Sequence, residues 1–239
     1  MPVLEAEKVT KYFGGLAAIS NVDFHVDQGE IFGLIGPNGA GKTTLFNLVS
    51  GALPLKSGVI KFKGEKITGL KRYQICRKGV ARTFQSVKIF ANIPARENVL
   101  LGALFGTPKP MAAEAAAKEA AELLDFVGLS AMSMMPAREL TLVSQKRLEV
   151  ATALATKPEL LLLDELMAGL NPTETAEAME LVTNIRAKGI TIFMIEHVMK
   201  AIMGVCDRIM VLHHGEKIAE GTPKEITTSK KVIEVYLGE

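Results

Sequence analysis

The pattern of apolar and polar residues along the chain predicts strands of two kinds. Residues 22–26 alternate between apolar and polar side chains, which is typical of a strand with one buried face. Residues 30–35, 160–163 and 190–195 are mainly apolar runs of strand length. Strands of a parallel sheet that is covered on both faces have this composition, so these three segments predict a parallel core.

Helices are predicted between and after these strands. Residues 42–50 carry apolar side chains at helical spacing, and Gly51 is a natural C-terminal stop. Residues 173–187 lie between two apolar runs and are interpreted as a crossover helix, while residues 111–127 are rich in Ala and Glu and also predict a helix. Strands that alternate with helices indicate the α/β class.

The change in character along the chain suggests a helical insertion in one domain. The length of 239 residues fits a single domain, 1–239, with a sizeable inserted segment. We assign the α/β core to residues 1–85 and 151–239 and the helical subdomain to about residues 86–150.

Composition excludes several classes of protein. Apolar residues make up 48% of the chain, and 28 basic residues nearly balance 26 acidic ones, so neither disorder nor a basic surface for nucleic acid is indicated. Aromatic residues are scarce, which argues against a base-stacking platform. The start has no signal-peptide pattern, and no apolar run approaches the roughly 20 residues of a membrane helix. We therefore expect a cytoplasmic chain without a nucleic-acid partner.

The strongest motif is a glycine-rich turn that matches G-x-x-x-x-G-K-[ST] without a mismatch. Its glycines allow successive backbone N–H groups to point at one spot at a helix N-terminus, which favours an anion. We expect Lys42 to reach the β- and γ-phosphates of a nucleotide and the Thr43 hydroxyl to bind Mg²⁺. The residues predicted to contact the phosphates are Gly36, Pro37, Asn38, Gly39, Ala40, Gly41, Lys42, Thr43 and Thr44. A plain turn without a ligand is the alternative interpretation.

A second candidate site follows the apolar run 160–163, where Asp164 and Glu165 stand at the predicted end of a buried strand. Ligands of open α/β sheets bind at this edge. Asp164 is suited to hold Mg²⁺, and Glu165 to orient the attacking water. His197 follows the next apolar strand and could contact the γ-phosphate or that water. Gln85, where the core gives way to the insertion, could contact Mg²⁺. In isolation, Asp164 and Glu165 could equally be an ordinary strand end, and His197 would be a solvent-exposed histidine at a strand terminus.

Taken together, these residues resemble the ATP-binding subunits of ABC transporters over essentially the whole chain. The resemblance implies a P-loop NTPase (RecA-like) parallel-sheet core, an N-terminal antiparallel β subdomain and an inserted helical subdomain. It also implies ATP and Mg²⁺ as cofactors. The positions that match the family's motifs are Phe13 for the aromatic that stacks on adenine, Gln85 for the Q-loop, Asp164 and Glu165 for the Walker B motif and catalytic Glu, Gly169-Leu170-Asn171 for the D-loop and His197 for the switch His.

Within the family, the segments 12–18, 79–85, 97–100 and 168–174 are similar to the LivG-like group of branched-chain amino acid uptake ATPases. This resemblance implies a peripheral protein on the inner face of the cell membrane. Its expected partners are a second ABC ATPase subunit (a paralogue or a second copy), polytopic permease subunits and, indirectly, an extracytoplasmic solute-binding protein. The alternatives are an ATPase of lipopolysaccharide export, a non-transport ABC ATPase and a non-catalytic nucleotide sensor.

One segment departs from the family pattern. The signature that the family writes L-S-G-G-Q falls on residues 140–144, where Thr141 still offers a hydroxyl to the partner's nucleotide. Leu142 and Val143 replace glycines, and a branched side chain obstructs close approach of a phosphate to the backbone. We therefore expect an asymmetric pair, in which the nucleotide site on Lys42 hydrolyses ATP well and the opposite site is slow.

Overall fold

The computed structural model describes residues 1–107, 109 and 111–237. The strands are β1 (Pro2–Phe13), β2 (Leu16–Asp27), β3 (Ile31–Ile35), β4 (Ser57–Phe62), β5 (Glu65–Lys66), β6 (Val80–Arg82), β7 (Leu160–Asp164), β8 (Thr191–Ile195), β9 (Arg208–His213) and β10 (Glu216–Gly221). The α-helices are α1 (Lys42–Val49), α2 (Arg72–Arg77), α3 (Ala95–Phe105), α4 (Ala113–Phe126), α5 (Leu142–Leu154), α6 (Pro172–Ala187), α7 (Met199–Val205), α8 (Pro223–Thr228) and α9 (Lys230–Leu237).

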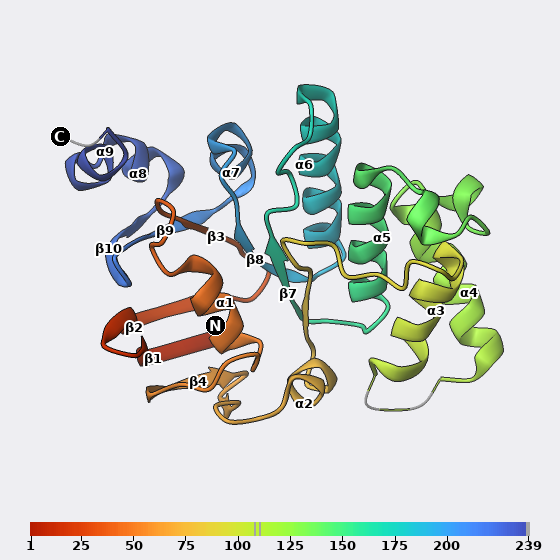
Figure 1. The fold of residues 1–239 in the computed structure, drawn as a ribbon, viewed down its shortest axis with the longest axis horizontal. Coiled ribbons are helices and arrows are strands. Elements are labelled where there is room, and N and C mark those ends of the chain that lie inside the picture. The colour runs from red at the N-terminus through yellow and green to blue at the C-terminus, as the bar shows by residue number, and fades with distance from the viewer. Residues whose placement is uncertain (108, 110, 238–239) are drawn as a thin grey trace.

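The centre of the molecule is a sheet in the order β10-β9-β3-β8-β7-β6 (Figure 1). Strands β9, β3, β8, β7 and β6 are parallel to one another, and β10 pairs with β9 as an antiparallel edge. Every residue of β3, β7 and β8 is buried. The prediction that the apolar runs form a parallel core is therefore confirmed.

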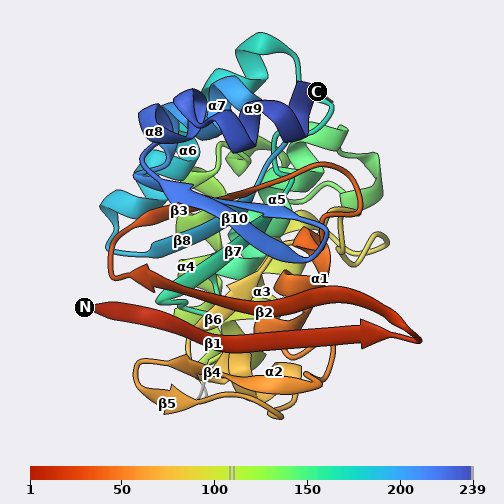
Figure 2. The ribbon, with the colours of Figure 1, turned by 90° about the vertical axis from the view of Figure 1, so that its left-hand side faces the viewer.

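A second sheet, in the order β2-β1-β4-β5, is antiparallel and lies over helix α1. Figure 2 shows β1 and β2 crossing the front of the molecule, with β10 between this sheet and helices α7–α9. Side chains alternate between the two faces of each central strand, so Phe32 and Leu34 of β3 point toward the antiparallel sheet. Phe24, Phe32, Phe46 and Phe193 pack together between the sheets, with ring centroids 4.7–6.1 Å apart.

Helices α3, α4 and α5 form a block at the end of the long axis opposite the antiparallel sheet (Figure 1). Small residues allow close packing within the block, and a Cβ added to Gly102 would lie 2.6 Å from the backbone oxygen of Thr152. Helix α5 begins inside the block and continues to Leu154 beside β6, so the predicted boundary at residue 150 falls within a helix.

The predicted crossover helix is α6. The Asn171 side chain accepts hydrogen bonds from the N–H groups of Thr173 and Glu174, and Pro172 occupies the first turn, so the start of this helix is encoded locally. The fold class predicted from the sequence is confirmed. No helix in the described part of the chain is long and apolar enough to cross a membrane.

Candidate active site

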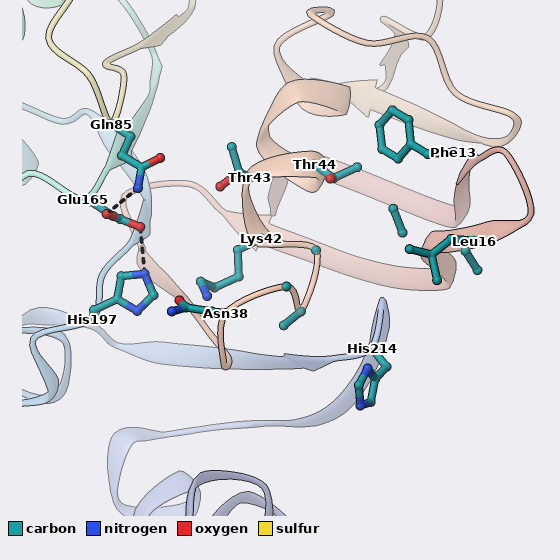
Figure 3. A pocket seen from close by; sticks show the side chains of 15 residues that line it. Phe13, Leu16, Asn38, Lys42, Thr43, Thr44, Gln85, Glu165, His197 and His214 are labelled. Carbon is teal, nitrogen blue, oxygen red and sulfur yellow. Dashed lines mark hydrogen bonds and ion pairs between the residues drawn. The ribbon is translucent and has the colours of Figure 1, made fainter.

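A cavity of about 390 Å³ opens at the carboxyl end of β3, where the chain turns into α1 (Figure 3). Segments far apart in the sequence line it: the turn between β1 and β2, the glycine-rich turn, the ends of β7 and β8, and the β9–β10 turn. The lining residues are Phe13, Leu16, Ala17, Ala18, Asn38, Gly39, Ala40, Gly41, Lys42, Thr43, Thr44, Gln85, Glu165, His197 and His214.

The turn from Gly36 to Gly41 is shaped by backbone conformations and close contacts that only glycine accommodates. Gly41 has φ of 103°, and a Cβ there would lie 2.4 Å from the backbone oxygen of Ala18. A Cβ on Gly36 would lie 2.2 Å from the backbone oxygen of Leu212. Gly41 is also the N-cap of α1, and no side chain caps this helix start. The first N–H groups of α1 therefore have no side-chain partner at the cavity lining, where an anion can accept their hydrogen bonds.

Lys42, the first residue of α1, folds back over the turn. Its Nζ donates hydrogen bonds to the backbone oxygens of Gly36 (2.6 Å) and Pro37 (3.0 Å). Burial lowers the pKa of Lys42, and the nearby charges of Glu165 and Asp164 act in the opposite direction. An anion in the cavity would meet a partly desolvated ammonium group, to which its attraction is stronger than in water.

Three residues predicted to act together converge on one side of the cavity. Glu165 Oε1 lies 2.7 Å from His197 Nε2, and Gln85 Nε2 donates a hydrogen bond of 3.0 Å to Glu165 Oε2 (Figure 3). Glu165 follows β7 and His197 follows β8, which are adjacent strands, so their carboxyl ends meet at one edge of the sheet. The Glu165 carboxylate faces Lys42 and Thr43 across the cavity.

Asp164 lies beneath this group rather than on the cavity wall. Its side chain is 1% exposed, and Arg82 Nη2 donates a hydrogen bond of 2.8 Å to its Oδ2. The other carboxylate oxygen, Oδ1, has no hydrogen-bond partner among the described residues. Burial raises the pKa of Asp164, and the hydrogen bond and charge of Arg82 offset part of this rise.

Sequence reasoning assigned no role to Arg82, although it ends the strand that leads to Gln85. Its Nη1 donates to Asn47 Oδ1 (2.7 Å) and Ser50 Oγ (3.0 Å) on the α1 side. Arg82 therefore ties the helix after the glycine-rich turn to the acidic strand end. The only signal in the sequence was the position of this arginine, three residues before the predicted site residue Gln85.

The far end of the cavity is apolar and aromatic. Phe13 and Leu16 come from the turn between β1 and β2, and His214 comes from the β9–β10 turn (Figure 3). Phe13 is 48% exposed, so it is a surface aromatic and not a core residue. A flat aromatic ring at the end opposite the cationic turn suits a ligand with a planar head and an anionic tail.

Thr141 is not brought to this cavity. It is the N-cap of α5, where its Oγ1 accepts a hydrogen bond from the Ser144 N–H (3.3 Å) and donates one to Ser144 Oγ (3.1 Å). Leu142 beside it is 53% exposed. The segment 140–144 thus presents a separate apolar helix start. Gly36 and Pro37 also lie outside the cavity lining, since their carbonyl groups hold Lys42.

A parallel sheet, a glycine-rich turn that enters a helix at Lys42 and Thr43, and an acidic strand end facing them define a P-loop NTPase. The family description "ABC transporter" matches residues 19–168, and "Branched-chain amino acid ATP-binding cassette transporter" matches residues 216–239. The chain belongs to the family of ABC transporter ATP-binding proteins.

Curated relatives and solved structures agree with this assignment. The branched-chain amino acid transport ATP-binding proteins BraF of Pseudomonas aeruginosa and LivG of Escherichia coli are each 41% identical to the chain, over all of it and 98% of their own lengths. The lipopolysaccharide export ATP-binding protein LptB of Haemophilus influenzae is 32% identical over the same shares. An ATP-binding cassette of an ABC transporter solved in its ADP conformation is 32% identical, with a TM-score of 0.91 over all of both chains.

Proposed function

We propose that this chain is the ATP-hydrolysing subunit of an ABC transporter that takes up branched-chain or related amino acids. The observation that carries the ATPase role is the group formed by Glu165, His197 and Gln85 opposite Lys42 in one cavity. The amino acid class is supported by the 41% identity to BraF and LivG, which exceeds the 32% identity to LptB.

ATP fits the cavity with its base at the apolar end and its triphosphate at the glycine-rich turn. Phe13 is exposed at the apolar end and offers a face on which adenine can stack. The N-terminal N–H groups of α1 and the Lys42 ammonium suit the β- and γ-phosphates. Lys42 would exchange its hydrogen bonds to the Gly36 and Pro37 carbonyls for bonds to phosphate oxygens.

The residues around Asp164 fit a magnesium ion. Asp164 Oδ1 is a buried carboxylate oxygen without a hydrogen-bond partner in the described chain, and oxygen atoms are the ligands that Mg²⁺ prefers. We assign the ion to Asp164, the Thr43 hydroxyl and the Gln85 side-chain oxygen, by direct contact or through water. When bound, Mg²⁺ would neutralise charge on the β- and γ-phosphates.

Hydrolysis then needs positioning and charge neutralisation and no covalent intermediate. The Glu165 carboxylate is suited to accept a hydrogen bond from the attacking water and to orient it toward the γ-phosphate. His197 lies 2.7 Å from the same carboxylate, so it can hold Glu165 in place and contact the γ-phosphate. Lys42 supplies positive charge on the opposite side, where charge on the leaving phosphate oxygens develops.

The partner of this chain is proposed to be a paralogous ATPase. In the pair, each nucleotide would lie between the glycine-rich turn of one subunit and the signature segment of the other. The signature segment here carries Leu142 and Val143, and its Thr141 hydroxyl is bonded to Ser144. Two copies of this chain would give two impaired sites, whereas a paralogue with glycines there would complete the site on Lys42.

Contact with membrane subunits is proposed at a second cavity, of about 250 Å³, between the central sheet and the helical block. Phe84 and Lys88 on either side of Gln85, together with Glu149 of α5, line it. A membrane subunit docked there would contact the segment around Gln85 directly. The chain would then lie on the inner face of the cell membrane, with a solute-binding protein on the opposite side.

The test uses the complex that copurifies with a tag on this chain from its native host. We expect polytopic membrane subunits and a second ATPase in the complex, ATP hydrolysis that Lys42→Ala abolishes, and uptake of labelled leucine, isoleucine or valine in cells. Loss of the chain without any effect on amino acid uptake would contradict the transport assignment. A complex that binds ATP without hydrolysing it would favour a nucleotide sensor.

The asymmetry is tested by making matched substitutions in the two ATPases. We expect Glu165→Gln to nearly abolish transport and the equivalent substitution in the partner to reduce it less. Equal losses from the two substitutions would exclude an asymmetric pair.

A further inference from the structure

The residue proposed to orient the attacking water has an unfavourable backbone conformation. Glu165 has φ of 53°, in the left-handed region that non-glycine residues rarely adopt. Such a conformation persists only where the surrounding structure holds it. The N–H of Glu165 donates to the backbone oxygen of Ile195 (2.9 Å), which fixes only the start of the turn that follows.

The rest of this turn, residues 165–168, is held by a lysine from another element. Lys146 lies on α5 and is 7% exposed. Its Nζ donates hydrogen bonds to the backbone oxygens of Glu165 (3.0 Å), Leu166 (2.9 Å) and Ala168 (2.7 Å). An ammonium group has three N–H donors, so this one buried side chain donates all three hydrogen bonds to the turn.

A buried acid completes the arrangement. Glu196 directly precedes His197 and is 1% exposed. Its Oε1 accepts a hydrogen bond from the Met167 N–H (2.7 Å). Burial raises the pKa of Glu196 to about 7 and lowers the pKa of Lys146, and the attraction between the two residues offsets part of both shifts. Lys146 therefore holds three carbonyl oxygens of the turn and Glu196 holds the Met167 N–H, while the Ala168 N–H closes the turn by donating to the Glu165 oxygen (3.3 Å). Neither residue lines the cavity, so neither can contact the nucleotide directly.

We infer that Lys146 and Glu196 are positioning residues for ATP hydrolysis, which hold Glu165 in its left-handed conformation so that its carboxylate meets Gln85 and His197. This inference rests on the proposed role of Glu165. Lys146 lies one turn after the start of α5 at Leu142. A displacement of α5 would therefore move the backbone of Glu165 through these hydrogen bonds. A change in the position of the α5 N-terminus would in this way alter the position of the Glu165 carboxylate.

The test compares Lys146→Met, Lys146→Arg and a matched control, Lys118→Met, in the copurified complex. Lys118 is an exposed lysine on α4, so its substitution makes the same chemical change away from the turn. We expect Lys146→Met to lower kcat for ATP about 10- to 100-fold, because a displacement of about 1 Å at a reacting group costs this much. Tm should fall, because three backbone oxygens lose a buried donor. The KM for ATP and the nucleotide affinity should stay near wild type, and Lys146→Arg should restore most of kcat.

Glu196 gives a second, independent arm in case Lys146→Met does not fold. Gln at this position can still accept the Met167 N–H, whereas Met cannot. We expect Glu196→Met to lower kcat more than Glu196→Gln does, with KM unchanged in both.

The inference is overturned if Lys146→Met and Glu196→Met keep wild-type kcat. It is also overturned if kcat, ATP affinity and Tm fall together and Arg restores none of them, because that result indicates a structural role alone. A wild-type complex without ATPase activity, or full activity in Glu165→Gln, would instead contradict the proposed function.

Discussion

The buried ion pair between Arg82 and Asp164 supports a prediction that joins stability to the site. We consider Arg82→Met, which keeps the apolar length of the side chain and removes its charge and donors. The guanidinium donates to Asp164, Asn47 and Ser50 at 2.7–3.0 Å. Its Cζ also lies 5.6 Å from the centroid of the Phe46 ring. The substitution therefore leaves several buried polar atoms without a donor at once.

The expected loss follows from the burial of the pair. The side chains of Arg82 and Asp164 are 7% and 1% exposed, so solvent screens them little. Removing one partner of a buried pair costs about 3–5 kcal/mol, mostly because the other charge stays buried and unpaired. For a chain of this length, each kcal/mol lowers Tm by about 2–4 °C, which predicts a fall of roughly 6–20 °C.

The loss should depend on pH with a definite sign. Burial raises the pKa of Asp164, and Arg82 lowers it. Without Arg82 this pKa rises further, so the folded variant holds a proton that the unfolded chain has released. The variant therefore loses stability as pH rises through that interval, and its deficit relative to wild type should be larger at about pH 8 than at about pH 5.

The assay is urea unfolding followed by circular dichroism, on the purified chain at both pH values. Arg186→Met is the matched control, because Arg186 pairs with Asp207 at the surface with 37% and 48% exposed side chains. Its substitution should cost less than about 1 kcal/mol. The double variant Arg82→Met with Asp164→Asn should recover part of the loss, since it removes the unpaired charge.

Three outcomes would refute this reasoning about Arg82. They are a loss no larger than that of Arg186→Met, a deficit that does not change with pH, and a double variant as unstable as the sum of the two single variants.

Three further predictions concern the cavity and the pH dependence of stability. Glu165→Gln should lower ATP turnover about 10²- to 10⁴-fold while binding of ATP persists, and a decrease of less than about 10-fold in steady-state assays would contradict the assigned role. Phe13→Ala should weaken ATP binding measured by calorimetry by about 1–3 kcal/mol, whereas Phe105→Ala on an exposed face of α3 should not; equal effects would exclude stacking. Burial raises the pKa of Glu149 from 4.5 to about 7, so the folded chain keeps a proton there that the unfolded chain releases, and stability falls as pH rises across this window. Glu149→Gln, which retains an acceptor for the Lys88 N–H, should match wild type near pH 4.5 and exceed it by up to about 3 kcal/mol near pH 8; a constant difference in urea unfolding would contradict this.

Local sequence was sufficient for the parts of this protein that are contiguous along the chain. The glycine-rich turn from Gly36 to Gly41, the helix start at Lys42 and the buried strand ending in Asp164 could each be predicted from neighbouring residues and from the pattern of apolar positions. The parallel core follows for the same reason, since strands covered on both faces must be apolar throughout. The position of Glu165 and His197 at one sheet edge could also be expected, because both follow apolar strands.

Tertiary structure decided the contacts between residues that are distant in sequence. Arg82 reaches Asp164 across 82 positions, Lys146 reaches the Glu165 turn from α5, and Glu196 reaches Met167 from the segment after β8. The neighbours of a charged residue in the sequence do not show whether it will be solvated or buried against a backbone turn. For Lys146 this depends on how α5 packs beside the sheet. The same packing explains why α5 continues past residue 150 to Leu154. The helix runs from the helical block to the central sheet, and its composition does not change where it passes from one to the other.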